Sequence, residues 1–317
     1  MTALYIALGV LGGALILVLL TAFVCFYMTF YSKTRDKRKL AELRLPEGKA
    51  YLPFRDEMFA WIKKARAMPH TEMEIRSYDG LTLRGRYYEK KAGLPIELQF
   101  HGYRGDSDRD LSGAIVRAFA VDRNALIIDH RGSGRSDGHV ITFGVKETRD
   151  CLFWIDHAIR YFGEDVKLHL TGISMGAATV LMASGEALPP QVRGVLADCP
   201  YSSAKEIIKK VIREMGLPAS LLYPFVRLGA RLFGGFDPND AEPIKAVARA
   251  KVPIILYHGD ADGFVPSEMS ERLFAACASE KKRLIKVKGA DHGLAFSVDK
   301  ENYLKALNEF IDENHMR

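Results

Sequence analysis

The sequence has only four cysteines among its 317 residues, and their positions exclude two classes of protein. They are scattered along the chain, at Cys25, Cys151, Cys199 and Cys277, and the first lies inside a long apolar run. This arrangement forms neither a disulfide framework nor a zinc-ligand spacing. It fits a reducing compartment, and we expect neither a metal nor an organic cofactor. Internal repeats and low-complexity tracts are also absent, so the chain has material for one large core.

Charged side chains are missing from Met1 to Ser32. The run from Leu4 to Tyr31 is almost continuously apolar and is long enough to cross a bilayer. A cleaved signal peptide is the alternative, but the segment lacks a basic start and a small-residue cleavage site, and it is too long. We therefore predict a transmembrane anchor over residues 1–32.

Basic residues follow this apolar run, and none precedes it. They are Lys33, Arg35, Lys37, Arg38, Lys39 and Arg44. Positive charge flanks the cytoplasmic end of a membrane span, so we expect a single-pass protein of the cell membrane whose remaining chain is cytoplasmic. These residues account for much of the net charge of +6, and no reader motif accompanies them, so nucleic-acid binding is not expected. Residues 33–70 are interpreted as a basic juxtamembrane linker followed by an amphipathic helix.

Strand and helix patterns alternate over residues 71–317, after an opening hairpin that turns at Asp79-Gly80. Such alternation predicts an α/β fold with a mostly parallel sheet and helices on both faces. The alternation lapses between Asp198 and Val252, where we expect a small helical cap over about 199–251. Its apolar residues are expected either to line an acyl pocket on the cap's underside or to pack on the sheet. They are Leu217, Leu221, Leu222, Tyr223, Phe225, Val226, Leu232, Phe233 and Phe236.

A candidate nucleophile lies in the segment Gly172-Ile-Ser174-Met-Gly176, between an apolar strand pattern and a helix of small residues. A serine on such a strand-to-helix turn is exposed to substrate, and the flanking glycines avoid clashes with the neighbouring strand and helix. The same pattern occurs around Ser136, but there it lies in a polar, glycine-spaced loop with no such helix after it. Ser136 is therefore interpreted as a turn residue.

A serine nucleophile needs a base and an orienting acid, and candidates for both follow predicted strands. Asp260 and Asp262 come after the strand at 252–257, and His292 comes after the strand at 283–287. The backbone N–H groups of Tyr103 and Met175 are the expected oxyanion donors. Other strand-end residues are interpreted as structural, among them His101, His258, Asp129 and Asp198.

Five segments together resemble the serine hydrolases of the α/β-hydrolase superfamily, over roughly residues 71 to 312. They are HGYRG at 101–105, DHRGSGRSDG at 129–138, GISMG at 172–176, HGDADGFVP at 258–266 and ADHG at 290–293. The resemblance implies an esterase, lipase or prolyl-oligopeptidase-like enzyme. It places the acid on Asp262, with Asp260 as the alternative, beside Ser174 and His292.

We therefore expect a membrane-anchored serine hydrolase that cleaves carboxylic esters or thioesters of a small-molecule or acyl substrate, with lipids favoured by the anchor and the apolar cap. A prolyl-oligopeptidase-like peptidase and a non-catalytic, membrane-tethered binding module are the alternatives. The sequence does not predict an oligomeric state.

Overall fold

The computed structural model describes residues 1–32, 42–46 and 48–317. Its body is an eight-stranded sheet in the order β1-β2-β4-β3-β5-β6-β7-β8. The strands are β1 (Thr71–Arg76), β2 (Thr82–Tyr88), β3 (Ile96–Phe100), β4 (Asn124–Ile128), β5 (Leu168–Ile173), β6 (Val192–Asp198), β7 (Ile254–Gly259) and β8 (Lys282–Val287). The pairs β1–β2 and β2–β4 are antiparallel, and all other neighbours are parallel. The expected mostly parallel α/β sheet is confirmed.

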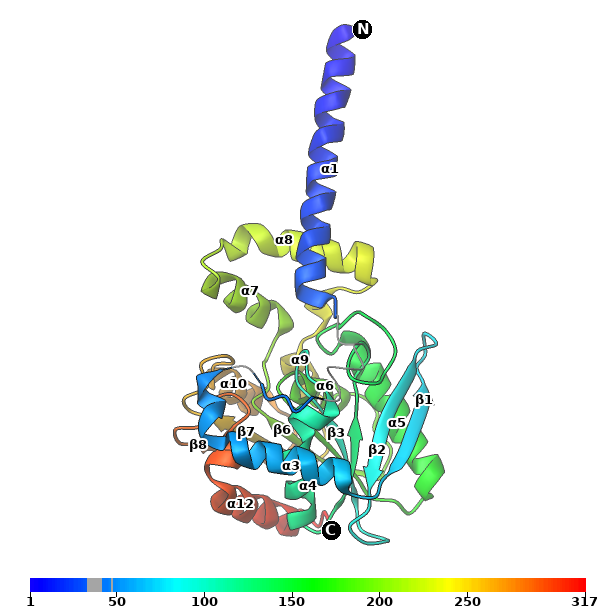
Figure 1. The fold of residues 1–317 in the computed structure, drawn as a ribbon, viewed down its shortest axis with the longest axis vertical. Helices are drawn as coiled ribbons and strands as arrows, with labels where there is room; N and C mark the ends of the chain where they lie inside the picture. Colours follow the sequence, from blue (N-terminus) through cyan, green and yellow to red (C-terminus); the bar gives the residue numbers. More distant parts are fainter. Residues whose placement is uncertain (33–41, 47) are drawn as a thin grey trace.

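Helices cover both faces of this sheet (Figure 1). Those of the body are η1 (Lys49–Phe54), α3 (Arg55–Ala67), α4 (Ser107–Ala120), α5 (Val145–Phe162), α6 (Met175–Ala183), α10 (Glu268–Ala276), α11 (Ala295–Val298) and α12 (Lys300–Glu313). On one face, Trp154 of α5 and Leu181 of α6 belong to one buried cluster with Leu98 of β3. On the other face, α4 packs on β4 and α12 packs on β7.

The central strands are apolar because both of their faces are covered. In β7, for example, Ile254 and Leu256 join the cluster under α5 and α6, whereas Ile255 and Tyr257 join the cluster under α12. Alternate side chains of a strand point to opposite faces, so a strand covered on both sides reads as a continuous apolar run. This is why the strand positions can be predicted to within about two residues.

The cap lies between β6 and β7. It consists of α7 (Ala204–Glu214), α8 (Ala219–Gly229), the short π-helix η2 (Ala230–Gly234), η3 (Pro238–Asp240) and α9 (Pro243–Val247). The expectation that all of its apolar residues face inward is wrong. Tyr223, Val226 and Phe236 are buried, but Leu221 and Leu232 are 62% and 54% exposed, and Leu217 and Phe233 are also exposed. A helix exposes part of its surface to both sides, so the apolar composition of α8 does not tell which face is inward.

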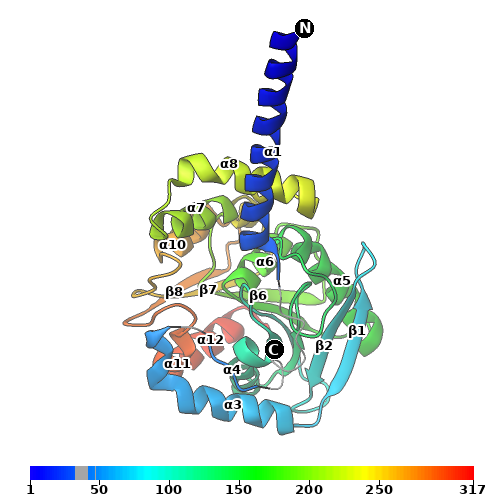
Figure 2. The ribbon, with the colours of Figure 1, turned by 45° about the horizontal axis from the view of Figure 1, so that its top comes forward.

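The N-terminal helix α1 (Thr2–Phe30) projects from the body, and α8 lies across its base (Figures 1 and 2). Ala22, Phe26 and Phe30 of α1 are buried against the cap and body. Gly229 of α8 permits the crossing, because a Cβ there would lie 2.2 Å from the carbonyl oxygen of Ala22. The end of the helix is therefore part of the folded body.

Most of the expected basic linker lies outside the described residues, which omit 33–41 and 47. Arg44 is described, and its guanidinium Nη2 lies 2.9 Å from Asp106 Oδ2. The helix expected after the linker is present as α3.

Candidate active site

Ser174 occupies the turn between β5 and α6, with φ 54° and ψ −114°. A positive φ is rare for a residue other than glycine and marks a strained turn. Both flanking glycines are required by close backbone contacts. A Cβ on Gly172 would lie 2.2 Å from the backbone of Gly176, and a Cβ on Gly176 would lie 2.1 Å from the carbonyl oxygen of Phe100. The Ser174 N–H donates to the Asp198 carbonyl at 2.8 Å, which fixes the turn to β6.

The structure brings His292 and Asp262 into line with this serine. His292 Nε2 lies 2.9 Å from Ser174 Oγ, and His292 Nδ1 lies 2.8 Å from Asp262 Oδ2. An ionised carboxylate only accepts hydrogen bonds, so Nδ1 carries the ring proton and Nε2 is free to accept the serine proton. All three residues follow the carboxyl ends of strands, where the loops of a parallel sheet converge.

The surroundings of Asp262 keep its carboxyl group ionised. Its Oδ1 accepts the N–H groups of Phe264 at 2.9 Å and Val265 at 2.8 Å. Burial alone would raise the pKa of Asp262, but hydrogen bonds from His258 and His292 hold that pKa well below its usual range. The carboxylate can therefore stabilise a charged His292.

His258 is a second neighbour of this carboxylate, and sequence reasoning left it out. Its Nε2 lies 2.8 Å from the Val265 carbonyl oxygen and 3.2 Å from Asp262 Oδ2. Both partners are acceptors, so Nε2 carries the proton, and Nδ1 accepts from the Ser270 hydroxyl at 2.6 Å. The position of His258, four residues before Asp262 and near the end of a buried strand, was the available signal.

The rival residues lie in other hydrogen-bond networks. Asp260 Oδ1 accepts the Gly289 N–H at 2.6 Å, and Asp198 Oδ2 lies 3.3 Å from the Tyr303 hydroxyl. The Ser136 hydroxyl donates to the Asp129 carbonyl at 2.6 Å and is fully buried. These contacts agree with the structural roles given to Asp198 and Ser136, and they show that Asp260 binds the Gly289 backbone whereas Asp262 contacts His292.

The loop after β3 passes directly beside the serine. A Cβ on Gly102 would lie 3.6 Å from Ser174 Cβ, so this loop borders the space where an acyl oxygen would sit. The Gly102 N–H is held by Asp110 Oδ2 at 3.1 Å, which leaves the next residue, Tyr103, as the expected donor of this loop. Met175 is the first residue of α6, where a backbone N–H has no partner within the helix. Both expected oxyanion donors thus come from segments that border Ser174.

The side chain of Tyr103 connects this loop to the N-terminal helix. Its hydroxyl donates to the carbonyl of Thr29 at 2.6 Å, and its ring lies 4.9 Å from that of Phe143. Burial raises the pKa of Tyr103 to about 12, so the hydroxyl keeps its proton and remains a donor. The next residue, Arg104, donates to the carbonyl of Met28 at 2.6 Å.

Two further side chains touch His292 and were not found from the sequence. The Tyr51 hydroxyl donates to the His292 carbonyl at 2.8 Å. Cys199 has a φ of 46°, and its Sγ lies 3.9 Å from His292 Nε2. Neither residue lies in a motif, so no sequence signal pointed to them.

Cys199, Asp262 and His292 are close enough to be tested as metal ligands. They do not fit a metal, because Ser174 and Asp262 already engage both nitrogens of His292. Burial also raises the pKa of the Cys199 thiol well above its ordinary value, so this sulfur is not a thiolate ligand. Within the part of the chain that the structure describes, we assign no metal to this cluster.

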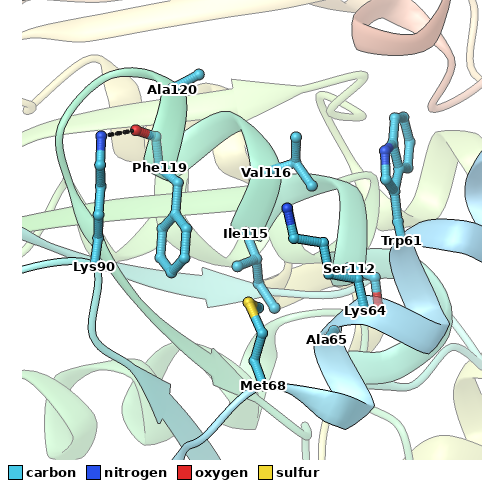
Figure 3. A pocket seen from close by; sticks show the side chains of 10 residues that line it. All are labelled: Trp61, Lys64, Ala65, Met68, Lys90, Ser112, Ile115, Val116, Phe119 and Ala120. Carbon is cyan, nitrogen blue, oxygen red and sulfur yellow. Dashed lines mark hydrogen bonds between the residues drawn. The ribbon is translucent and has the colours of Figure 1, made fainter.

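A cavity of about 300 Å³ lies between α3 and α4, away from these residues. Figure 3 shows Trp61, Ile115, Val116 and Phe119 around it. The Lys90 ammonium at its rim donates to the Phe119 carbonyl at 2.6 Å. Its walls are mostly apolar, and its lining contains none of the expected site residues.

Comparison with known proteins identifies a family that this chain resembles. A family model of the α/β hydrolase fold matches residues 98–241, which contain the strands and loops around Ser174. This match and the fold support a member of the α/β-hydrolase superfamily, and therefore a hydrolase.

Solved structures show the same α/β-hydrolase fold. The Pyrococcus furiosus esterase Pf2001 superposes with a TM-score of 0.64 at 20% identity, covering 79% of this chain and 94% of the esterase. The mouse alpha/beta hydrolase domain-containing protein 10 superposes with a TM-score of 0.56 at 19% identity, covering 77% of this chain and 99% of the mouse protein. At these identities the likeness concerns the fold alone.

Relatives by sequence include the uncharacterized protein YqkD of Bacillus subtilis, which is 27% identical over 194 residues. That match covers 60% of this chain and 62% of YqkD, so the chain spans less than two thirds of this relative. The protein bem46 of Schizosaccharomyces pombe is 25% identical over 252 residues, which is 78% of each chain.

Proposed function

We propose that this α/β-hydrolase cleaves carboxylic esters or thioesters through an acyl-enzyme formed on Ser174. The observation that supports this most directly is the hydrogen-bonded chain from Ser174 Oγ through His292 to Asp262, with 2.9 and 2.8 Å between successive polar atoms. This is the arrangement of nucleophile, general base and orienting acid that acyl transfer requires.

In the proposed reaction, Ser174 Oγ attacks the substrate carbonyl while its proton passes to His292 Nε2. The carbonyl oxygen becomes an oxyanion that the N–H groups of Tyr103 and Met175 stabilise. His292 then gives the proton to the departing alcohol or thiol, and the acyl-enzyme forms. A water molecule repeats the sequence, with His292 as its base, and releases the carboxylic acid and free Ser174. Asp262 keeps the tautomer of His292 and stabilises its charged form.

We further propose that α1 anchors the enzyme in a membrane, with the body on the cytoplasmic side. Its 29 residues have a mean hydropathy of 2.6 in their most apolar window. A signal sequence would pass the same test, but burial of Ala22, Phe26 and Phe30 favours a retained helix, since its removal would expose the residues that they cover. The anchor and the apolar cap favour acyl substrates drawn from lipids.

Labelling with a fluorophosphonate tests the nucleophile. We expect the wild type and Ser136→Ala to be labelled and Ser174→Ala to be unlabelled, because Ser174 contacts His292 Nε2 whereas the Ser136 hydroxyl donates to a backbone carbonyl. Ser136 is the matched control, since it lies in the same five-residue pattern. Circular dichroism must show that each variant is folded. A folded Ser174→Ala that is labelled, or that hydrolyses p-nitrophenyl esters like the wild type, refutes the proposal.

The substrate class is tested with the same preparations. We expect hydrolysis of p-nitrophenyl esters and little hydrolysis of aminoacyl arylamides. The reverse preference indicates a peptidase, and absence of both labelling and hydrolysis in the folded wild type indicates a binding module.

A further inference from the structure

The helix pair α8–η2 is apolar on two opposite sides. Its inward side buries Ala219, Tyr223, Val226 and Ala230. Its outward side carries a second row of apolar residues at helical spacing, which we call the outer stripe. The stripe consists of Leu217, Leu221, Pro224, Phe225, Leu228 and Leu232. No described residue outside the stripe buries Leu221 or Leu232, which are 62% and 54% exposed. Leu217 and Pro224 are also exposed, whereas Phe225 and Leu228 are half-buried. A largely exposed apolar row of this length is typical of an interaction surface.

The position of the outer stripe relative to α1 indicates what covers the stripe. α8–η2 crosses α1 at the level of Ala22 and Phe26, where Gly229 meets Ala22 and the Phe233 ring lies 5.8 Å from that of Phe26. Figures 1 and 2 show α8 extending sideways from α1 rather than along it. From Thr2 to Ala22 the helix rises about 30 Å. This equals the thickness of the hydrocarbon core of a bilayer, about 30 Å. A bilayer crossed by the free part of α1 would therefore end at the level of α8–η2.

The charged residues of α8–η2 also fit a position at the edge of the bilayer. Its only charged residues, Arg227 and Arg231, are basic and flank the stripe, and both guanidinium groups pair with Asp237. Arg231 remains 54% exposed, so its outer side can also contact anionic headgroups. The stripe itself contains no charged side chain. An apolar face with basic residues at its edge is the composition of helices that lie in a membrane interface.

We propose that α8 and η2 lie in the plane of the membrane interface, with the outer stripe among the headgroups and the upper parts of the acyl chains. The cap then rests on the bilayer beside the anchor. This inference rests on the proposed crossing of the membrane by α1, but not on the chemistry of Ser174. In this arrangement a lipid surface, and not a second protein chain, covers the outer stripe.

Tryptophan quenching in the full-length protein tests this contact. The variants Leu221→Trp and Leu232→Trp each put a fluorophore on the stripe, and Tyr161→Trp puts one on α5 as a matched control, since Tyr161 is 57% exposed on the body. Each is reconstituted in phosphatidylcholine vesicles whose chains are brominated near the headgroup, and the emission of the parent, which contains Trp61 and Trp154, is subtracted. We expect brominated lipid to remove about half or more of the added emission in both stripe variants, and little in the control.

Carbonate extraction separates the two possible failures. If the protein stays with the vesicles and both stripe variants are unquenched, the interfacial contact is refuted while the anchor stands. If carbonate releases the protein, the anchor fails and this inference fails with it. If the stripe variants are unquenched and chemical cross-linking joins two copies of the protein, the stripe is a contact between copies of the chain. Fluorophosphonate labelling is independent of all these results.

Discussion

The base of α1 should contribute to the stability of the whole body, and Phe30→Ala tests this. Phe30 is fully buried, and its ring lies 5.0 Å from that of Phe236 and 5.7 Å from that of Phe143. Truncation of a buried phenylalanine costs about 3–5 kcal/mol, from lost burial and from the cavity that remains. The unfolded body can place Phe30 in detergent, which recovers part of the burial term. The lower end of the range therefore applies, and it corresponds to a fall of about 6 °C or more in the unfolding midpoint.

The assay follows the fluorescence of the buried Trp154 during heating of the full-length protein in detergent. Leu11→Ala is the matched control, because Leu11 lies on the same helix but is 67% exposed. We expect its midpoint to change by less than about 2 °C. Equal midpoints for the parent, Phe30→Ala and Leu11→Ala would refute the reasoning and show that α1 does not contribute to the stability of the body. An intact mass that lacks residues 1–32 would also refute it, because the helix would then have been removed.

Two further substitutions test the site. Gly176→Ala should abolish labelling of Ser174 or prevent folding, because the new Cβ would lie 2.1 Å from the backbone oxygen of Phe100, which cannot move away; labelling at the wild-type rate would contradict this. Asp262→Asn should lower kcat for ester hydrolysis by about 10⁴-fold, because an amide does not hold the required tautomer of His292. The lowered pKa of Asp262 means that its ionised form stabilises the fold above its usual pKa of 3.8 and that this contribution is lost as the pH falls below that value. The midpoint difference between wild type and Asp262→Asn should therefore be larger at pH 7 than at pH 3, and an equal difference at both would contradict this reading.

The sequence predicts the sheet and the turn at Ser174 well because both depend on local rules. A strand covered on both faces must be apolar over its whole length, and a strained serine turn needs glycine on both sides. The choice of Ser174 over Ser136 needed only the small-residue helix that follows it. The acid was different, because Asp260 and Asp262 follow the same strand. The resemblance favoured Asp262, and the loop geometry agrees, because Asp260 binds the Gly289 N–H whereas Asp262 contacts His292.

Contacts between distant segments could not be predicted from the sequence. The Tyr51 hydroxyl reaches the His292 carbonyl across 241 residues of chain, and no local pattern encodes that distance. The prediction that all apolar residues of the cap face inward was wrong for a related reason. Leu221 and Tyr223 are both apolar neighbours on α8, and which of them faces inward depends on how the helix is packed against α1 and the body.

The packing of α1 also bears on how the site is positioned. One buried cluster contains Phe26 and Phe30 of α1, Tyr223 of α8 and Met175, the first residue after the candidate nucleophile. A second connection runs through the Tyr103 hydroxyl, which holds the Thr29 carbonyl while the backbone of the same residue borders Ser174. One expected oxyanion donor thus contacts the base of α1 through its side chain, and the other lies in the same buried cluster as that base. Side chains that only tethered the enzyme would have no reason to pack there. In our proposal the base of α1 therefore also supports the site, because displacing it would loosen the two segments that we expect to hold the oxyanion.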